Sequence, residues 1–177
     1  MDDLVKQAML KWPNVPDCFG WLGLDARGDW YMRDEGVQAA GEFPKAKGSR
    51  LQHDKLIGFI ARNYSCDALG QWFFQNGPQR VYVALENTPW VWRINTDGTI
   101  KSHTEQRTTV HKCLLDEHGH LYFDTPLGVG LVHTQDVLEA SQLIEKSNWT
   151  VHTIGYEALP TQYKFVRQPF CQAIIRQ

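Results

Sequence analysis

The chain has 177 residues, of which 42% are hydrophobic and 21% charged, and its formal net charge is −2. This composition is typical of a globular protein and argues against a disordered chain. The balanced charge gives no reason to expect the whole chain to bind nucleic acid or an anionic membrane. No apolar run approaches the ~18 residues that cross a bilayer, and residues 1–12 lack the pattern of a signal peptide. We therefore expect a cytoplasmic protein without a membrane partner.

The first predicted element is a helix over residues 2–12, with Asp2 or Asp3 as its cap. Its apolar residues recur at helical spacing; they are Leu4, Val5, Ala8, Met9 and Trp12. Pro13 ends the helix because proline cannot continue the backbone hydrogen bonds. A hairpin over residues 19–33 follows.

The turn of this hairpin has a sequence pattern that recurs twice. When Gly28, Gly98 and Gly119 are aligned, the residue three positions earlier is Asp25, Asn95 or Asp116. An Asp or Asn side chain accepts hydrogen bonds from the amides of a tight turn, and glycine adopts the left-handed backbone that closes it. The sequence therefore predicts three hairpins of one design. Their unequal spacing argues against a propeller or solenoid.

The remaining elements are predicted from periodicity and turn residues. We expect a polar loop over residues 38–53, a helix over 53–64, and strands over 71–75 and 80–86 joined by a turn at 76–78. A strand over 89–94 leads into the second hairpin. After the third hairpin, Thr134 caps a helix that extends to about residue 146, and a strand follows over 149–154.

This order of elements predicts an α+β fold. Helices and strands do not alternate as in βαβ units, so an antiparallel strand-rich meander with about three helices is favoured. The pattern allows two small subdomains, residues 1–78 with a hairpin plus a helix and residues 79–177 with more strands and one helix.

The preferred binding site is an aromatic-rich sheet surface with Arg80 as a polar anchor. Alternation along the strands places several rings on shared faces, where an arginine could pair with an anion or stack on a ring. The predicted ligand-binding residues are Trp72, Phe73, Phe74, Arg80, Tyr82, Trp90 and Trp92. The competing interpretation is that a second layer covers these rings as core.

Two weaker sites are considered beside it. A His/Asp cluster, Asp116, His118, His120 and His133, has ligand types that bind zinc or iron, although polar residues also belong at a hairpin tip. A basic loop, Lys45, Lys47 and Arg50, could contact phosphate or an RNA backbone, although a solvated loop also carries such charges.

The chain also resembles a family of uncharacterised proteobacterial proteins described only as a domain of unknown function. The resemblance lies in three motifs: Lys-Trp-Pro-Asn-Val-Pro at residues 11–16, Gly-Trp-Leu-Gly-Leu-Asp-Ala-Arg-Gly at 20–28, and Trp-Phe-Phe-Gln-Asn-Gly-Pro-Gln-Arg-Val-Tyr at 72–82. A more distant similarity, to a second family of unknown function, lies in an Asp-x-x-Gly-x-Trp hairpin followed by a helix, an aromatic strand and an acidic-Pro-aromatic step at 86–90. It implies a two-part α+β architecture. Neither resemblance implies an activity, cofactor or catalytic residue.

We therefore predict a small ligand- or protein-binding or regulatory module that uses the aromatic surface and needs no cofactor. The first alternative is a metal-dependent hydrolase-like enzyme at the His/Asp cluster. The second is an RNA-associated protein that uses the basic loop, although the charge balance does not favour a nucleic-acid partner. No catalytic motif is recognised, so a non-enzymatic role is preferred.

Overall fold

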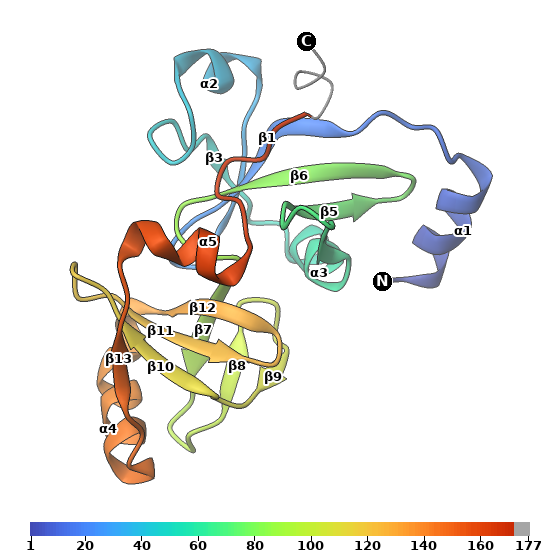
Figure 1. Cartoon of the computed structure of the whole chain (residues 1–177). Helices are drawn as coiled ribbons and strands as arrows, with labels where there is room; N and C mark the ends of the chain where they lie inside the picture. The colour runs from blue at the N-terminus through green and yellow to red at the C-terminus, as the bar shows by residue number, and fades with distance from the viewer. Residues whose placement is uncertain (172–177) are drawn as a thin grey trace. The chain divides into compact units, whose positions relative to one another are not determined.

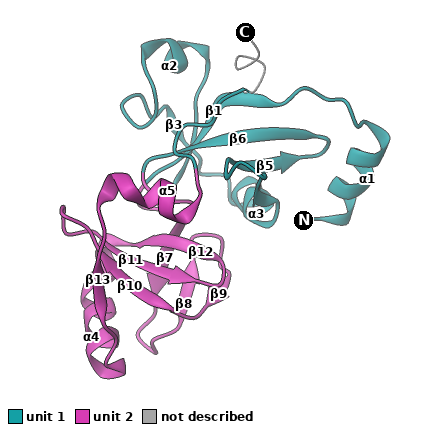
Figure 2. Cartoon of the chain, viewed as in Figure 1, with its two compact units in different colours: residues 1–25, 29–86, 166–177 teal, residues 26–28, 87–165 magenta. Residues whose placement is uncertain are grey.

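The structure is a computed structural model that describes residues 1–171. The chain forms two compact units. Figure 2 shows the described residues of the first unit, 1–25, 29–86 and 166–171, and those of the second, 26–28 and 87–165. The Gly77–Pro78 turn lies within the first unit, between two strands of one hairpin.

The first unit is built on a six-stranded mixed sheet in the order β3-β2-β1-β6-β5-β4 (Figure 1). The strands are β1 (Cys18–Leu24), β2 (Trp30–Met32), β3 (Ser49–Arg50), β4 (Tyr64–Cys66), β5 (Trp72–Asn76) and β6 (Gln79–Leu85). The two central strands, β1 and β6, are parallel, and all other pairs are antiparallel. Both central strands end in a buried leucine, Leu24 and Leu85, as expected of strands covered on both faces.

Three helices belong to this unit: α1 (Asp3–Lys11), α2 (Glu35–Ala40) and α3 (Asp54–Arg62). Helix α3 packs against β5, where the rings of Phe59 and Phe74 meet edge to face with centroids 5.3 Å apart. His53 caps α3, because its Nδ1 accepts a hydrogen bond from the Leu56 amide at 3.2 Å.

The second unit contains a seven-stranded mixed sheet in the order β13-β10-β11-β12-β7-β8-β9. The strands are β7 (Trp90–Ile94), β8 (Ile100–Ser102), β9 (Arg107–Thr108), β10 (Lys112–Leu115), β11 (Leu121–Thr125), β12 (Gly128–Val132) and β13 (Val151–Thr153). Strand β12 pairs in parallel with β7, as β10 does with β13. The core of the second unit includes the stacked Trp90 and Trp92 rings, whose centroids are 5.9 Å apart.

The helical segments of the second unit follow β12 or β13. They are η1 (Thr134–Asp136), α4 (Val137–Ser147), η2 (Tyr156–Ala158) and α5 (Leu159–Tyr163). His133, rather than the predicted Thr134, caps the first of these segments, since its Nδ1 accepts a hydrogen bond from the Gln135 amide at 3.1 Å.

The α+β class and the richness in strands are confirmed, and two details are corrected. The described residues form five α-helices instead of about three, because α2 and α5 arise where a loop and an irregular tail were expected. Asp34 explains α2: its carboxylate accepts the Val37 amide at 2.9 Å and caps the helix. The two sheets are mixed, with mostly antiparallel pairs as expected of an antiparallel strand-rich meander, but three pairs of distant segments are parallel.

The three predicted hairpins are present and share their geometry. They join β1 to β2, β7 to β8, and β10 to β11. Gly28, Gly98 and Gly119 have φ values of 83°, 79° and 81°, which only glycine adopts without strain. A fourth turn of the same kind, not predicted, joins β4 to β5. It begins at Asp67 and has Gly70 at φ 77°.

No helix within residues 1–171 is long and apolar enough to span a membrane.

Candidate functional site

Most of the predicted aromatic site lies in the hydrophobic cores of the two units. The buried members are Phe73, Phe74, Tyr82, Trp90 and Trp92. Trp90 and Trp92 belong to the second unit, while the others belong to the first. Trp72 and Arg80 keep intermediate exposure. The surface that remains accessible is therefore smaller than the predicted one and is centred on Arg80.

Arg80 lines a cavity of about 670 Å³ in the first unit. The cavity lies between the start of β1, the turn that follows β4, strand β6 and the segment after α5. Its wall includes the ring of Phe19, which stacks on the ring of Tyr82 with centroids 4.4 Å apart and planes inclined by 5°. A flat aromatic wall and a cationic side chain thus face one space.

The side chain of Arg80 is positioned by stacking rather than by an ion pair. Its guanidinium carbon lies 4.8 Å from the centroid of the Phe73 ring, and the two residues project from neighbouring strands, β5 and β6. Within residues 1–171, no carboxylate lies within ion-pair distance of Arg80. The charge is held in place by an aromatic face and is not neutralised there.

The polar side of the cavity is the turn that begins at Asp67. One carboxylate oxygen accepts the amides of Leu69 and Gln71, each at 2.9 Å. The other accepts the Gln71 side-chain amide at 3.3 Å and the Tyr82 hydroxyl at 3.1 Å. Burial raises the pKa of Tyr82, and although Arg80 opposes this shift, the carboxylate of Asp67 adds to it. Tyr82 is therefore a neutral hydroxyl near neutral pH.

Several residues of this cavity were not predicted, namely Asp17, Phe19, Asp67, Gln71 and Phe170. The segment 67–72 carries a signal that could have located the turn. It reads Asp-Ala-Leu-Gly-Gln-Trp, the same Asp-x-x-Gly-x-Trp pattern as residues 25–30. Phe170 lies 90 residues beyond Arg80 in the chain, and no local pattern predicts that it lines the same cavity.

The basic loop does not form a free positive patch. Lys47 contacts Glu86 at 2.7 Å and Asp25 at 3.3 Å, and Arg50 contacts Asp29 at 2.7 Å. Two of its three cations therefore have carboxylate partners, and Lys45 is exposed. These ion pairs join the loop to residues that flank β1, β2 and β6 of its own unit.

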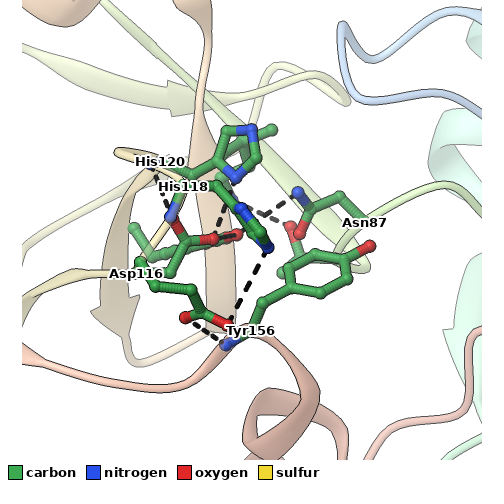
Figure 3. Close-up of polar contacts among 9 residues, drawn as sticks. Asn87, Asp116, His118, His120 and Tyr156 are labelled. Atoms are coloured by element: carbon green, nitrogen blue, oxygen red, sulfur yellow. Dashed lines mark hydrogen bonds and ion pairs between the residues drawn. The ribbon is translucent and has the colours of Figure 1, made fainter.

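The His/Asp cluster of the second unit is organised around Asp116, which is buried at the hairpin between β10 and β11 (Figure 3). One of its oxygens accepts the amides of His118 and His120 at 2.9 and 2.8 Å. The other lies 2.9 Å from His120 Nδ1 and accepts the Tyr122 hydroxyl at 2.8 Å. Burial pushes the pKa of Asp116 upward, but these donors outweigh it and leave the pKa lowered.

The predicted metal group is not assembled from these residues. His118 and His120 lie near one another, with ring centroids 6.0 Å apart, whereas His133 is buried after β12 and caps the next helical segment. Among the described residues, no three His, Cys, Asp or Glu side chains are placed to hold a metal ion together. The carboxylate of Asp116 is instead occupied by turn amides, a histidine and a tyrosine.

A comparison with protein families identifies the class of this chain. The model of the family DUF2944, described as "Protein of unknown function (DUF2946)", matches residues 1–170. The chain therefore belongs to this family, and the predicted membership in a family of unknown function is confirmed. No curated protein matches.

Two solved structures are similar to this chain. One is a DUF1285 family protein from Silicibacter pomeroyi DSS-3, with 10% identity, coverage of 73% of this chain and 72% of that chain, and a TM-score of 0.49. The other is a DUF1285 family protein from Shewanella baltica OS155, with 14% identity, coverage of 73% and 97%, and a TM-score of 0.49.

Proposed function

We propose that the first unit is a binding module for a small ligand that combines an anionic group with a flat apolar body. The observation that carries this proposal is Arg80, a cation stacked on Phe73 that lines a cavity without a carboxylate partner among residues 1–171. A guanidinium presents several N–H donors in a fixed plane, which suits a carboxylate or phosphate.

The other walls of the cavity support the flat apolar part of the ligand. The ring of Phe19 has intermediate exposure and stacks on the buried Tyr82, and offset stacking on such a ring favours a planar partner. The volume of about 670 Å³ falls within the range of about 300–1,000 Å³ found for small-molecule sites. Arg80 therefore selects the anionic group of the ligand, and the ring of Phe19 selects its flat apolar body.

The two carboxylates of the cavity are poorer sites for a cationic ligand. Asp67 is already occupied by two backbone amides, the Gln71 side chain and the Tyr82 hydroxyl. Asp17 is exposed, where water screens its charge. Arg80, which is less exposed than Asp17, is therefore the charge that selects the ligand.

The proposal is tested by titrating the protein with 8-anilinonaphthalene-1-sulfonate, a fluorescent aromatic anion, and competing with phenyl phosphate, benzylamine or inorganic phosphate. We expect phenyl phosphate to displace the dye best, because it alone offers both a ring and an anion. Arg80→Gln should weaken dye binding by about tenfold, since hydrogen bonds to a charged group contribute roughly 1.5–3 kcal/mol and about 1.4 kcal/mol is tenfold.

The matched control is Arg107→Gln, which removes an equal charge from an exposed position on β9 in the second unit. This variant should bind the dye as the unmodified protein does. Equal displacement by benzylamine and phenyl phosphate, or equal affinity in Arg80→Gln and Arg107→Gln, would show that Arg80 does not recognise an anion.

A further inference from the structure

The chain contains one hydrogen-bonding arrangement twice, once in each unit. In the first unit, Asp67 accepts amides two and four residues later through one oxygen, and the Gln71 side chain and a tyrosine hydroxyl through the other. In the second unit, Asp116 makes the corresponding contacts, with His120 in the place of Gln71. The two turns thus form an internal comparison in which the residue four positions after the aspartate differs.

The two turns share an N–H donor four residues after the aspartate, but only the histidine also has a second ring nitrogen. In both of these turns a side-chain N–H at this position donates to the second carboxylate oxygen, and the Gln71 amide does so in the first unit. His120 provides the same donor through Nδ1, which leaves Nε2 with a lone pair. Gln71 is 1% exposed, whereas 40% of the His120 side chain is exposed. Among residues 1–171, Nε2 of His120 has no hydrogen-bond partner.

We propose that His120 is a nucleophile that takes up acyl groups from activated esters or thioesters. A carboxylate that accepts Nδ1–H fixes the tautomer and the orientation of the ring, and it stabilises the cation that forms when Nε2 reacts. Asp116 is suited to this task because its side chain is fully buried and lies 2.9 Å from Nδ1. Since its pKa is lowered by the donors around it, it stays ionised near neutral pH.

The reaction consists of two steps. In the first, the Nε2 lone pair forms a bond to the acyl carbon, and the leaving oxygen or sulfur departs with the electron pair of the broken bond. The positive charge gained by the ring is then compensated by the carboxylate of Asp116. In the second, water adds to the acyl carbon, the N–C electron pair returns to Nε2, and a carboxylic acid and one proton are released. The net reaction is hydrolysis.

Two rings lie beside His120 and bound the space next to its imidazole. The ring of Tyr156 lies 6.4 Å from His120 and 5.7 Å from His118, measured between centroids, and Figure 3 shows these side chains beside Asp116. On the Leu115–Glu117 side of the same turn, a separate cavity of about 380 Å³ is lined by residues of β10, β13 and the segments that follow them, and His120 is not among its lining residues. All of these residues belong to the second unit, so the inference is independent of the ligand site around Arg80.

The test uses p-nitrophenyl acetate with the full chain and two variants, His120→Gln and His152→Gln. His120→Gln copies the arrangement that Gln71 already forms, so the turn is expected to stay folded, and circular dichroism checks this. His152 is the matched control: it is exposed on β13, and no described carboxylate lies within ion-pair distance of it.

We expect His120→Gln to lower the rate of p-nitrophenolate release by about 100-fold, the lower end of the range for a positioned catalytic side chain, and His152→Gln to leave it unchanged. Rapid quenching and peptide mass spectrometry should find an acetyl group on His120 and none on His152. A folded His120→Gln protein that hydrolyses the ester as fast as the His152→Gln protein would overturn the proposal. So would equal acetylation of the two histidines.

Discussion

Replacing either of two glycines of the second unit is predicted to lower the free energy of unfolding, for a different physical reason at each position. Variants of the two glycines should separate these reasons. Gly119 closes the β10–β11 turn with φ 81°, and a Cβ built there meets nothing within 4 Å. Gly130, on β12, lacks a positive φ, but a Cβ there would lie 2.7 Å from the Trp90 Cβ and would also strike the Trp92 indole. The first glycine is needed for its backbone and the second for its missing side chain.

The expected costs follow from these two causes. Gly119→Ala should lower the free energy of unfolding by about 1–2 kcal/mol, the cost of a left-handed backbone for an ordinary L-residue. Gly119→Asn should cost less, because asparagine tolerates that region. Gly130→Ala should cost about 1–3 kcal/mol through overpacking, and Gly130→Asn should cost more still, since its larger side chain meets the same rings.

The assay is urea unfolding followed by both tryptophan fluorescence and far-ultraviolet circular dichroism, so that agreement of the two probes checks for a single transition. The diagnostic result is the opposite order of the Ala and Asn variants at the two positions. If Asn were worse than Ala at Gly119, or better than Ala at Gly130, the assignment of backbone and steric causes would be wrong.

Two further predictions concern titratable side chains of the second unit, Asp136 and His103. Asp136 accepts hydrogen bonds from Arg93 at 2.6 and 3.2 Å and from the Ile94 amide at 3.0 Å. Asp136→Asn should therefore lower the free energy of unfolding in urea by roughly 1–3 kcal/mol. A cost equal to that of Asp97→Asn, a substitution at an exposed position, would contradict this prediction. Burial lowers the pKa of His103 from 6.5 to about 3, and its Nδ1 accepts the Val91 amide at 3.3 Å. The folded protein should therefore lose stability as the pH falls from 6.5 toward 3, with a slope of up to ~1.4 kcal/mol per pH unit from this group; in His103→Gln that contribution should vanish, and an unchanged pH profile would refute it.

The local structure could be predicted from the sequence wherever one residue type determines the backbone. Gly28, Gly98 and Gly119 located three hairpins because their positive φ leaves few alternatives. The turn ending at Gly70 was missed although it has the same pattern, because the strand before it, β4, begins at Tyr64, where the predicted helix over residues 53–64 had only just ended. The parallel pairing of β1 with β6 joins segments far apart in the chain, and no local signal encodes such a pairing.

The candidate site was predictable only in part, because alternation along a strand assigns residues to a face without showing what covers that face. Phe73 and Phe74 point to opposite faces of β5, yet both are buried. Phe59 of α3 packs on Phe74, and on the other face Arg80 and Tyr82 lie against Phe73. Arg80 was identified correctly as a residue beside the rings, but it covers one of them and leaves less aromatic surface open than predicted.

The repeated turns show which position of the turn varies while its backbone is kept. In three of the four turns the aspartate at the start accepts the amide four residues later, while in the turn that begins at Asn95 the Thr99 amide donates to Asp97 instead. The residue four positions after the first varies: Asp29, Gln71, Thr99 and His120. In two turns that residue also bonds the second oxygen of the aspartate, and a glutamine or a histidine does so. Since the side-chain amide of Gln71 already provides the hydrogen bond to the second oxygen of Asp67, a histidine at this position brings a second ring nitrogen that this hydrogen bond does not use. The nucleophile proposed at position 120 is therefore a test of whether a side chain beyond the needs of the turn has a role of its own.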